Sequence, residues 1–177
     1  TFGMLEGWNF FREISWLHLL WLVWMADMLP QLVPYPNHVP LGSTKLFARR
    51  FRPGKISPDP EALRSFLRKE NRGAALVFAV WCALLAVIGF CYHRSLFGRP
   101  VLFLICVFFY VCDLICVLVW CPFRLMMGNR CCTTCRIFNW DHLMMFTPMI
   151  FMGGFYAVTL LGLAFAAWLV WEVCIMM

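Results

Sequence analysis

The chain has 177 residues, of which 63% are hydrophobic and only 14% are charged. A soluble domain is typically about half apolar and about a quarter charged, so this composition excludes an ordinary water-soluble domain, a disordered segment and a collagen-like chain. The mean hydropathy of +0.76 and the net charge of +6 instead predict a basic integral membrane protein. Because the chain starts at Thr1 and stops inside an apolar run, we expect it to be part of a longer protein.

Four segments are apolar enough over a sufficient length to cross a bilayer, which requires about 20 mostly apolar residues. They cover residues 8–29, 73–92, 101–120 and 143–173. The last segment is longer than one span requires, and Pro148 and the pair Gly153 and Gly154 allow either a kink or a division into a short leading helix and a membrane helix. The sequence therefore predicts an all-α protein built as a four-helix transmembrane bundle.

The basic residues set the expected orientation. The connection 30–72 holds nine Lys or Arg residues and the connection 121–142 holds three, whereas the connection 93–100 holds only Arg94 and Arg99. Since short loops rich in Lys and Arg stay in the cytoplasm, we expect both long loops to be cytoplasmic and both termini to lie outside, in the cytoplasmic (inner) membrane. A basic rim of this kind is attracted to anionic lipid headgroups. No nucleic-acid motif is present, so the lipid bilayer is the expected partner and nucleic acid is not.

A helix start is well marked within the first long loop. Asp59 is an expected N-cap, Pro60 falls at the first helical position, and Glu61 suits the positive end of the helix. The helix 61–71 would carry apolar residues on one side and basic residues on the other. It is interpreted as a membrane-surface helix that leads into the second span, or as a docking surface for a partner membrane or cytoplasmic subunit.

The second long loop is rich in cysteine. Cys121, Cys131, Cys132 and Cys135 fall within fifteen residues, and the reducing cytosol disfavours disulfides. Clustered thiols in such a loop are often metal ligands or redox groups. Cys132 and Cys135 have the spacing to share one metal with Cys121, and Cys131 or His142 would complete a four-ligand site for zinc or an iron–sulfur cluster. A redox-active thiol pair without metal, or no chemistry at all, are the alternatives.

Four polar side chains inside the predicted spans are candidate functional groups. Ionisable groups at this depth are expensive and mark functional sites by default. Asp113 lies in the middle of the third span, where Cys112 and Cys116 share its helix face, and His18 lies inside the first. We expect Asp113 to face the bundle interior and to be protonated near neutral pH unless a cation or metal lies beside it. Haem is not expected, because His18 and His93 lie at different depths.

A methionine stripe follows His142. On an ideal helix Met145, Met149 and Met152 share one face with His142 and Tyr156. Thioether and imidazole groups of this kind can pass a soft ion such as Cu(I). The same stripe is more often an adaptable packing face, and packing is the favoured interpretation here.

Three functional classes remain open. The leading hypothesis is a small membrane protein with a cytoplasmic cysteine-rich metal, iron–sulfur or redox site, acting as an accessory subunit of a membrane redox complex. The second is a permease for a soft metal ion or small solute that uses the intramembrane Cys, Asp and Met side chains. The third is a non-catalytic scaffold that docks a partner. The sequence carries none of the soluble-enzyme motifs sought, such as a P-loop or HExxH, so it leaves enzymatic activity undecided.

Overall fold

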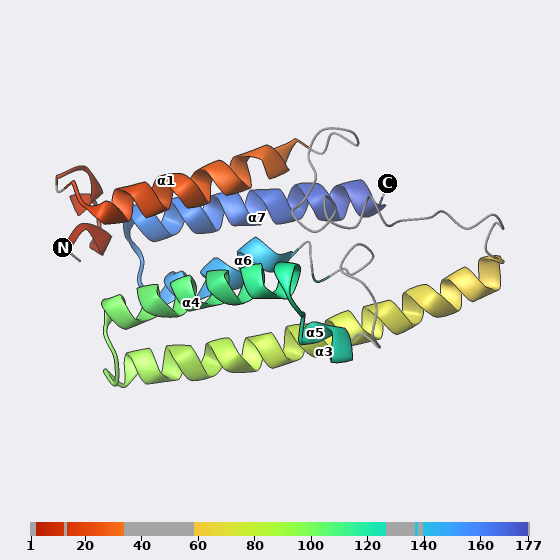
Figure 1. Cartoon of the computed structure of the whole chain (residues 1–177). Helices are drawn as coiled ribbons and strands as arrows, with labels where there is room; N and C mark the ends of the chain where they lie inside the picture. The colour runs from red at the N-terminus through yellow and green to blue at the C-terminus, as the bar shows by residue number, and fades with distance from the viewer. Residues whose placement is uncertain (1–2, 13, 34–58, 127–136, 138–139, 177) are drawn as a thin grey trace.

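The computed structural model of the chain describes residues 3–12, 14–33, 59–126, 137 and 140–176 (Figure 1). Within these residues every regular element is a helix and no strand occurs. Three of the helices are long and apolar enough to cross a membrane, so the chain is an all-helical membrane protein. These are α3 (Pro60–His93), α4 (Arg99–Leu118) and α7 (Gly154–Met176).

The N-terminal region differs from the single span expected over 8–29. It consists of the 3₁₀ turns η1 (Gly3–Leu5) and η2 (Asn9–Phe11), the helix α1 (Trp16–Met28) and a further 3₁₀ turn, η3 (Leu29–Leu32). The helix starts late because Ser15 caps it: the Ser15 hydroxyl accepts the N–H of Leu17, and the His18 ring accepts the N–H of Ser15. With 13 residues, α1 is too short to cross a bilayer core of about 30 Å by itself.

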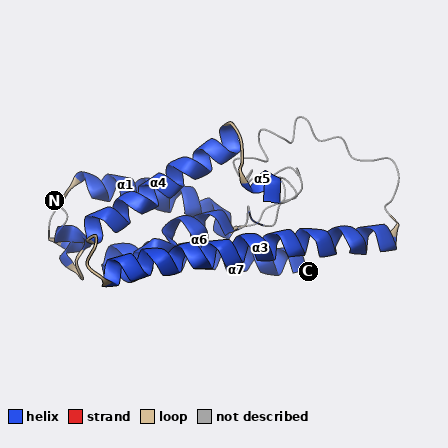
Figure 2. Cartoon of the chain, turned by 90° about the horizontal axis from the view of Figure 1, so that it is seen from below, coloured by secondary structure: helices blue, strands red, loops and turns tan. Residues whose placement is uncertain are grey.

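The helix α3 begins at Pro60 with Asp59 as its N-cap, as the sequence predicts. It then continues for 34 residues, which corresponds to a length of about 51 Å. The expected surface helix and the second span are therefore one continuous helix. Its N-terminal part projects beyond the other helices in line with the span, rather than lying flat as a separate element (Figure 2). The connection after α4 contains a short helix, α5 (Phe123–Met126).

The segment 143–173 is divided, which is one of the two outcomes that the sequence allows. It contains a short helix α6 (Asp141–Phe146), the 3₁₀ helix η6 (Thr147–Phe151) and then α7. The chain reverses at Gly153 and Gly154, which have φ angles of +66° and +83°. A side chain at Gly154 would also stand 2.9 Å from the Leu5 carbonyl oxygen. Both the backbone conformation and the lack of space therefore require glycine at this turn.

This reversal puts α6 and η6 in the centre of the bundle. The α6 helix packs on α4 and α7, η6 packs on α3 and α4, and α1 packs on α7. Most of the side chains of α6 and η6 are buried, including Phe146, Pro148 and Met149. The helices α1, α3, α4 and α7 surround this short central segment. The four-helix arrangement expected from the sequence did not include such a central segment.

The reversal at Gly153 and Gly154 also affects where the two ends of the chain lie. The N-terminal turns lie against the start of α7, where Phe155 donates its N–H to the Gly7 carbonyl at 2.9 Å. The end of α7 lies at the opposite end of the bundle (Figure 1). The two ends of the described chain therefore lie at opposite ends of the bundle, whereas the sequence prediction placed both termini on the same side of the membrane.

Candidate functional site

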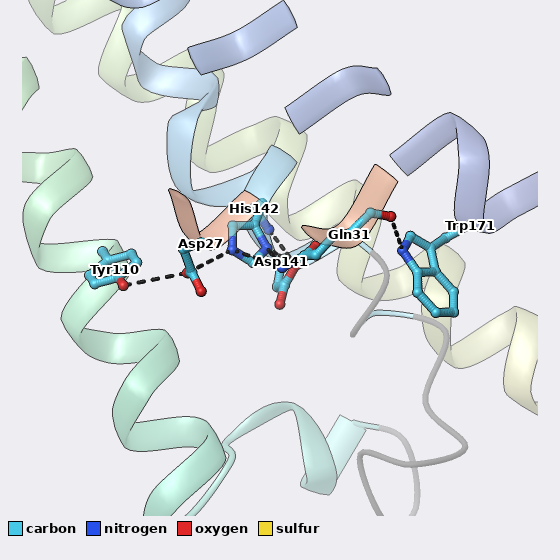
Figure 3. Close-up of polar contacts among 6 residues, drawn as sticks. All are labelled: Asp27, Gln31, Tyr110, Asp141, His142 and Trp171. Atoms are coloured by element: carbon cyan, nitrogen blue, oxygen red, sulfur yellow. Dashed lines mark hydrogen bonds and ion pairs between the residues drawn. The ribbon is translucent and has the colours of Figure 1, made fainter. Parts of the chain in front are cut away.

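A charged cluster centred on His142 lies where α1, α4, α6 and α7 meet (Figure 3). The His142 ring is buried, and its Nδ1 lies 2.7 Å from a carboxylate oxygen of Asp141. Its Nε2 lies 3.2 Å from a carboxylate oxygen of Asp27, which comes from α1. One imidazole therefore bridges two carboxylates that are far apart in the sequence.

Three polar side chains extend this cluster to neighbouring helices. The Tyr110 hydroxyl of α4 donates to Asp27 at 3.5 Å, and the Gln31 amide lies 3.3 Å from Nε2 of His142. The indole N–H of Trp171, from α7, donates to the Gln31 carbonyl at 2.9 Å. We refer to Asp27, Gln31, Tyr110, Asp141, His142 and Trp171 as the histidine cluster.

The environment of His142 favours its charged form. Burial alone disfavours the imidazolium, but the charge of Asp141 and the hydrogen bonds to Asp141 and Asp27 outweigh it and raise the pKa of His142 to about 10. The ring is therefore an imidazolium at neutral pH and donates from both nitrogens. The cluster then holds one positive charge between two carboxylates.

Beside the cluster lies a cavity of about 240 Å³ with an almost entirely apolar surface. Its wall is made by α3, α4, the connection through α5, and α6. The lining residues are Trp81, Phe108, Phe109, Cys112, Asp113, Cys116, Cys121, Pro122, Phe123, Ile137, Asp141, Met144 and Met145. This cavity lies toward the C-terminal end of α4, near the start of the cysteine-rich loop.

Asp141 belongs to both features, because it lines the cavity and pairs with His142. Asp113 lies across the same cavity and is close enough to interact electrostatically with Asp141 and His142. Among the described residues, Asp113 forms no hydrogen bond or ion pair. Asp141 therefore connects the wall of the cavity to the buried His142.

The structure brings together several cysteines that the sequence pointed out. Cys112, Cys116 and Cys121 line the same cavity, and the last two lie within hydrogen-bonding distance of each other. Cys131, Cys132 and Cys135 lie outside the described residues. In the part of the chain that is described, no group of three or more His, Cys, Asp or Glu side chains is arranged to hold a metal ion. His142 itself has carboxylate partners on both ring nitrogens.

The other two candidate features have structural roles. The Nε2 atom of His18 lies 2.7 Å from the Phe10 carbonyl oxygen, and the ring also caps α1, so this residue fastens the N-terminal turns to the helix. Met145, Met149 and Met152 are all buried in the main hydrophobic core. Only Met145 also borders the cavity, so the methionine stripe mainly provides packing.

Sequence reasoning missed most of the histidine cluster. Of its six residues, the sequence pointed out only His142, as a candidate metal ligand, and Asp27, Gln31, Tyr110, Asp141 and Trp171 were not identified. One signal was available: Asp27 lies within a predicted span, and Asp141 and His142 are adjacent just before the span 143–173. Ionisable groups in such segments tend to pair with one another. The chain matches no protein-family model, no curated protein and no solved structure.

Proposed function

We propose that this protein is a permease for a small solute and that it couples solute binding to movement of a proton. The observation that carries the proposal is the position of Asp141, which lines the cavity and pairs with the buried His142. Ionisable side chains in membrane proteins mark substrate paths and proton relays. A charged solute in the cavity would change the field at His142 and so change its proton affinity.

The coupling follows from the charges present. With His142 protonated, the cluster carries two carboxylates and one imidazolium, and Asp113 adds a third acidic group nearby. A cation in the cavity would compete with the imidazolium for Asp141 and favour release of the histidine proton. An anion would have the opposite effect, and a neutral solute would have little effect.

Sidedness is part of the proposal. The cavity is bordered by α5, which carries Arg124, and by α3, whose N-terminal part carries Arg64, Arg68, Lys69 and Arg72. By the positive-inside rule the end of the bundle with these basic residues would face the cytoplasm. The cavity would then be reached from the cytoplasmic side.

The test uses liposomes that contain the full chain and a pH-sensitive dye. Four probes are added in turn: benzyltrimethylammonium as an organic cation, benzoate as an organic anion, phenylalanine as a zwitterion, and Zn²⁺. We expect at least one probe to change the internal pH in the parent protein, and Asp141→Asn to abolish this change. Asp59→Asn, at the start of α3, is the matched control and should behave as the parent. If no probe moves protons, the proposal is refuted.

A second candidate is a cysteine-bound zinc ion or iron–sulfur cluster. The observation that favours it is the shared position of Cys112, Cys116 and Cys121 on one cavity, next to the loop that carries the remaining predicted thiol ligands. Metal analysis of anaerobically purified protein tests it directly. Cys121→Ser should lower the bound metal, whereas Cys82→Ser, an exposed thiol on α3, should leave it unchanged.

A further inference from the structure

The cavity has aromatic walls on two sides. The Trp81 and Phe109 rings face it from α3 and α4, with their centroids 4.9 Å apart, and Phe108 packs beside Phe109 at 6.1 Å. The indole N–H of Trp81 is already donated to the Thr147 hydroxyl at 3.2 Å. This side chain therefore offers a solute its π-system rather than a hydrogen-bond donor.

The charged side chains that line the cavity itself are all acidic. Asp113 and Asp141 are the ionisable carboxyl groups on its wall, and none of the described lining residues is Lys, Arg or His. Asp141 has His142 as its partner, whereas Asp113 has no hydrogen-bond or ion-pair partner among the described residues. An acidic group without a partner in an apolar wall is complementary to a positively charged solute.

Size and polarity narrow the class of cation. A cavity of about 150 Å³ is large enough to bind benzene, so the 240 Å³ found here accommodates a ring with an added ammonium group. Mg²⁺ and Ca²⁺ require about six or more oxygen ligands, which this apolar wall does not provide. A strongly polar neutral solute would leave its hydrogen-bonding groups unsatisfied against the wall.

We propose that the cavity binds a small lipophilic organic cation, such as an aromatic amine in its protonated form or a quaternary ammonium compound. The inference rests on the proposed function, since it names the substrate class of the same cavity. The ammonium group would lie near Asp113 and against the Trp81 and Phe109 rings, because cations bind the faces of aromatic rings. The apolar part of the solute would fill the remaining space beside Met144 and Met145.

The experiment measures equilibrium binding of benzyltrimethylammonium to the detergent-purified full chain at pH 7. Its neutral isostere, neopentylbenzene, is the shape control. Asp113→Asn removes the charge with little change in volume and should weaken binding at least about tenfold. Trp81→Leu should weaken it roughly 2- to 30-fold, the range expected for a cation–π contact. Asp59→Asn and Trp16→Leu, at exposed positions on α3 and α1, should bind as the parent does.

Thermal unfolding of each variant confirms that it is folded, and Asp113→Asn gives the decisive comparison if Trp81→Leu is unstable. The inference is overturned if the parent shows no saturable binding, if neopentylbenzene competes equally well, or if Asp113→Asn binds as tightly as the parent. In the liposome assay, a proton signal with benzoate, phenylalanine or Zn²⁺ but not with the cation supports the permease and refutes this substrate class. Saturable binding of the cation without any proton signal supports this class of ligand and refutes the permease.

Discussion

Replacing His142 with glutamine should destabilise the protein in a pH-dependent way. The substitution removes the positive charge between Asp27 and Asp141 and leaves two carboxylates close together. Removing one partner of a buried ion pair costs about 3–5 kcal/mol. Asp141 is 12% exposed and Asp27 is 48% exposed, so most of this loss comes from Asp141 and the lower end of the range applies. For a chain of this size, about 3 kcal/mol lowers the melting temperature by roughly 6–12 °C.

The sign of the pH dependence follows from the folded and unfolded pKa values of His142. The folded pKa is raised to about 10 from an unfolded value of 6.5. The stabilisation is therefore fully present below pH 6.5, decreases above it, and is lost as the pH rises through 10. The difference in melting temperature between the parent and His142→Gln should shrink over this interval.

The measurement is thermal unfolding in detergent at half-unit steps from pH 6 to pH 10.5. Other groups that face His142 are Asp27, Asp113 and Asp141, and repeating the series in an Asp113→Asn background separates any contribution from Asp113. His93→Gln, at the far end of α3, is the matched histidine control. A difference between parent and variant that stays constant across the pH range would refute the pairing described here.

Two further substitutions, one with a matched control, test the packing of η6 on α3 and the hydrogen bond between α7 and η3. In Gly89→Leu the new side chain would start 2.6 Å from the Phe151 ring, so we expect a loss of about 1–3 kcal/mol in the free energy of unfolding. The control is Gly162→Leu, where no atom lies within 4 Å of the new Cβ. This variant should be at least as stable as the parent. Trp171→Phe removes the 2.9 Å hydrogen bond to the Gln31 carbonyl and should cost about 1 kcal/mol. Denaturation in detergent measures both effects, and equal stability of the two leucine variants would contradict the packing of η6 on α3.

The membrane class and two of the spans could be predicted because they depend on composition and run length alone. The segment 73–92 holds an uninterrupted apolar run and lies within α3. The segment 101–120 is interrupted only by Asp113, and all but its last two residues lie within α4. The start at Pro60 was also predictable, since a proline after an N-cap residue is a local signal. These features need no knowledge of which segments touch.

The division of the last segment could only be predicted as one of two outcomes. A proline and a glycine pair are compatible with a kink or with a division into a short leading helix and a membrane helix, and the choice depends on what the turn packs against. At Gly154 the deciding contact is the backbone of Leu5 and Gly7, which lie almost 150 residues earlier in the chain. Likewise, the late start of α1 depends on the local hydrogen bonds of Ser15 and His18, which hydropathy does not report.

Prediction of the candidate site from the sequence is limited in the same way, because the site also depends on contacts between distant segments. The shared position of Cys112, Asp113 and Cys116 follows from helical spacing, so the sequence could place them together. The pairing of His142 with Asp27 joins residues 115 positions apart in the sequence, and no periodicity predicts it. Polar residues in apolar segments show that partners are needed but do not identify them.

The energetics of the histidine cluster argue for a role beyond stability. A buried ion pair gains little over apolar residues of similar volume, and replacing the whole set is often neutral or stabilising by about 1–4 kcal/mol. We therefore expect the triple variant Asp27→Leu, Asp141→Asn and His142→Leu to be at least as stable as the parent, unlike His142→Gln alone. The same variant should lose all proton movement in the liposome assay. If it is instead as unstable as the single variant, the cluster serves mainly to hold the helices together, and the proton-coupled role proposed for Asp141 loses its physical basis.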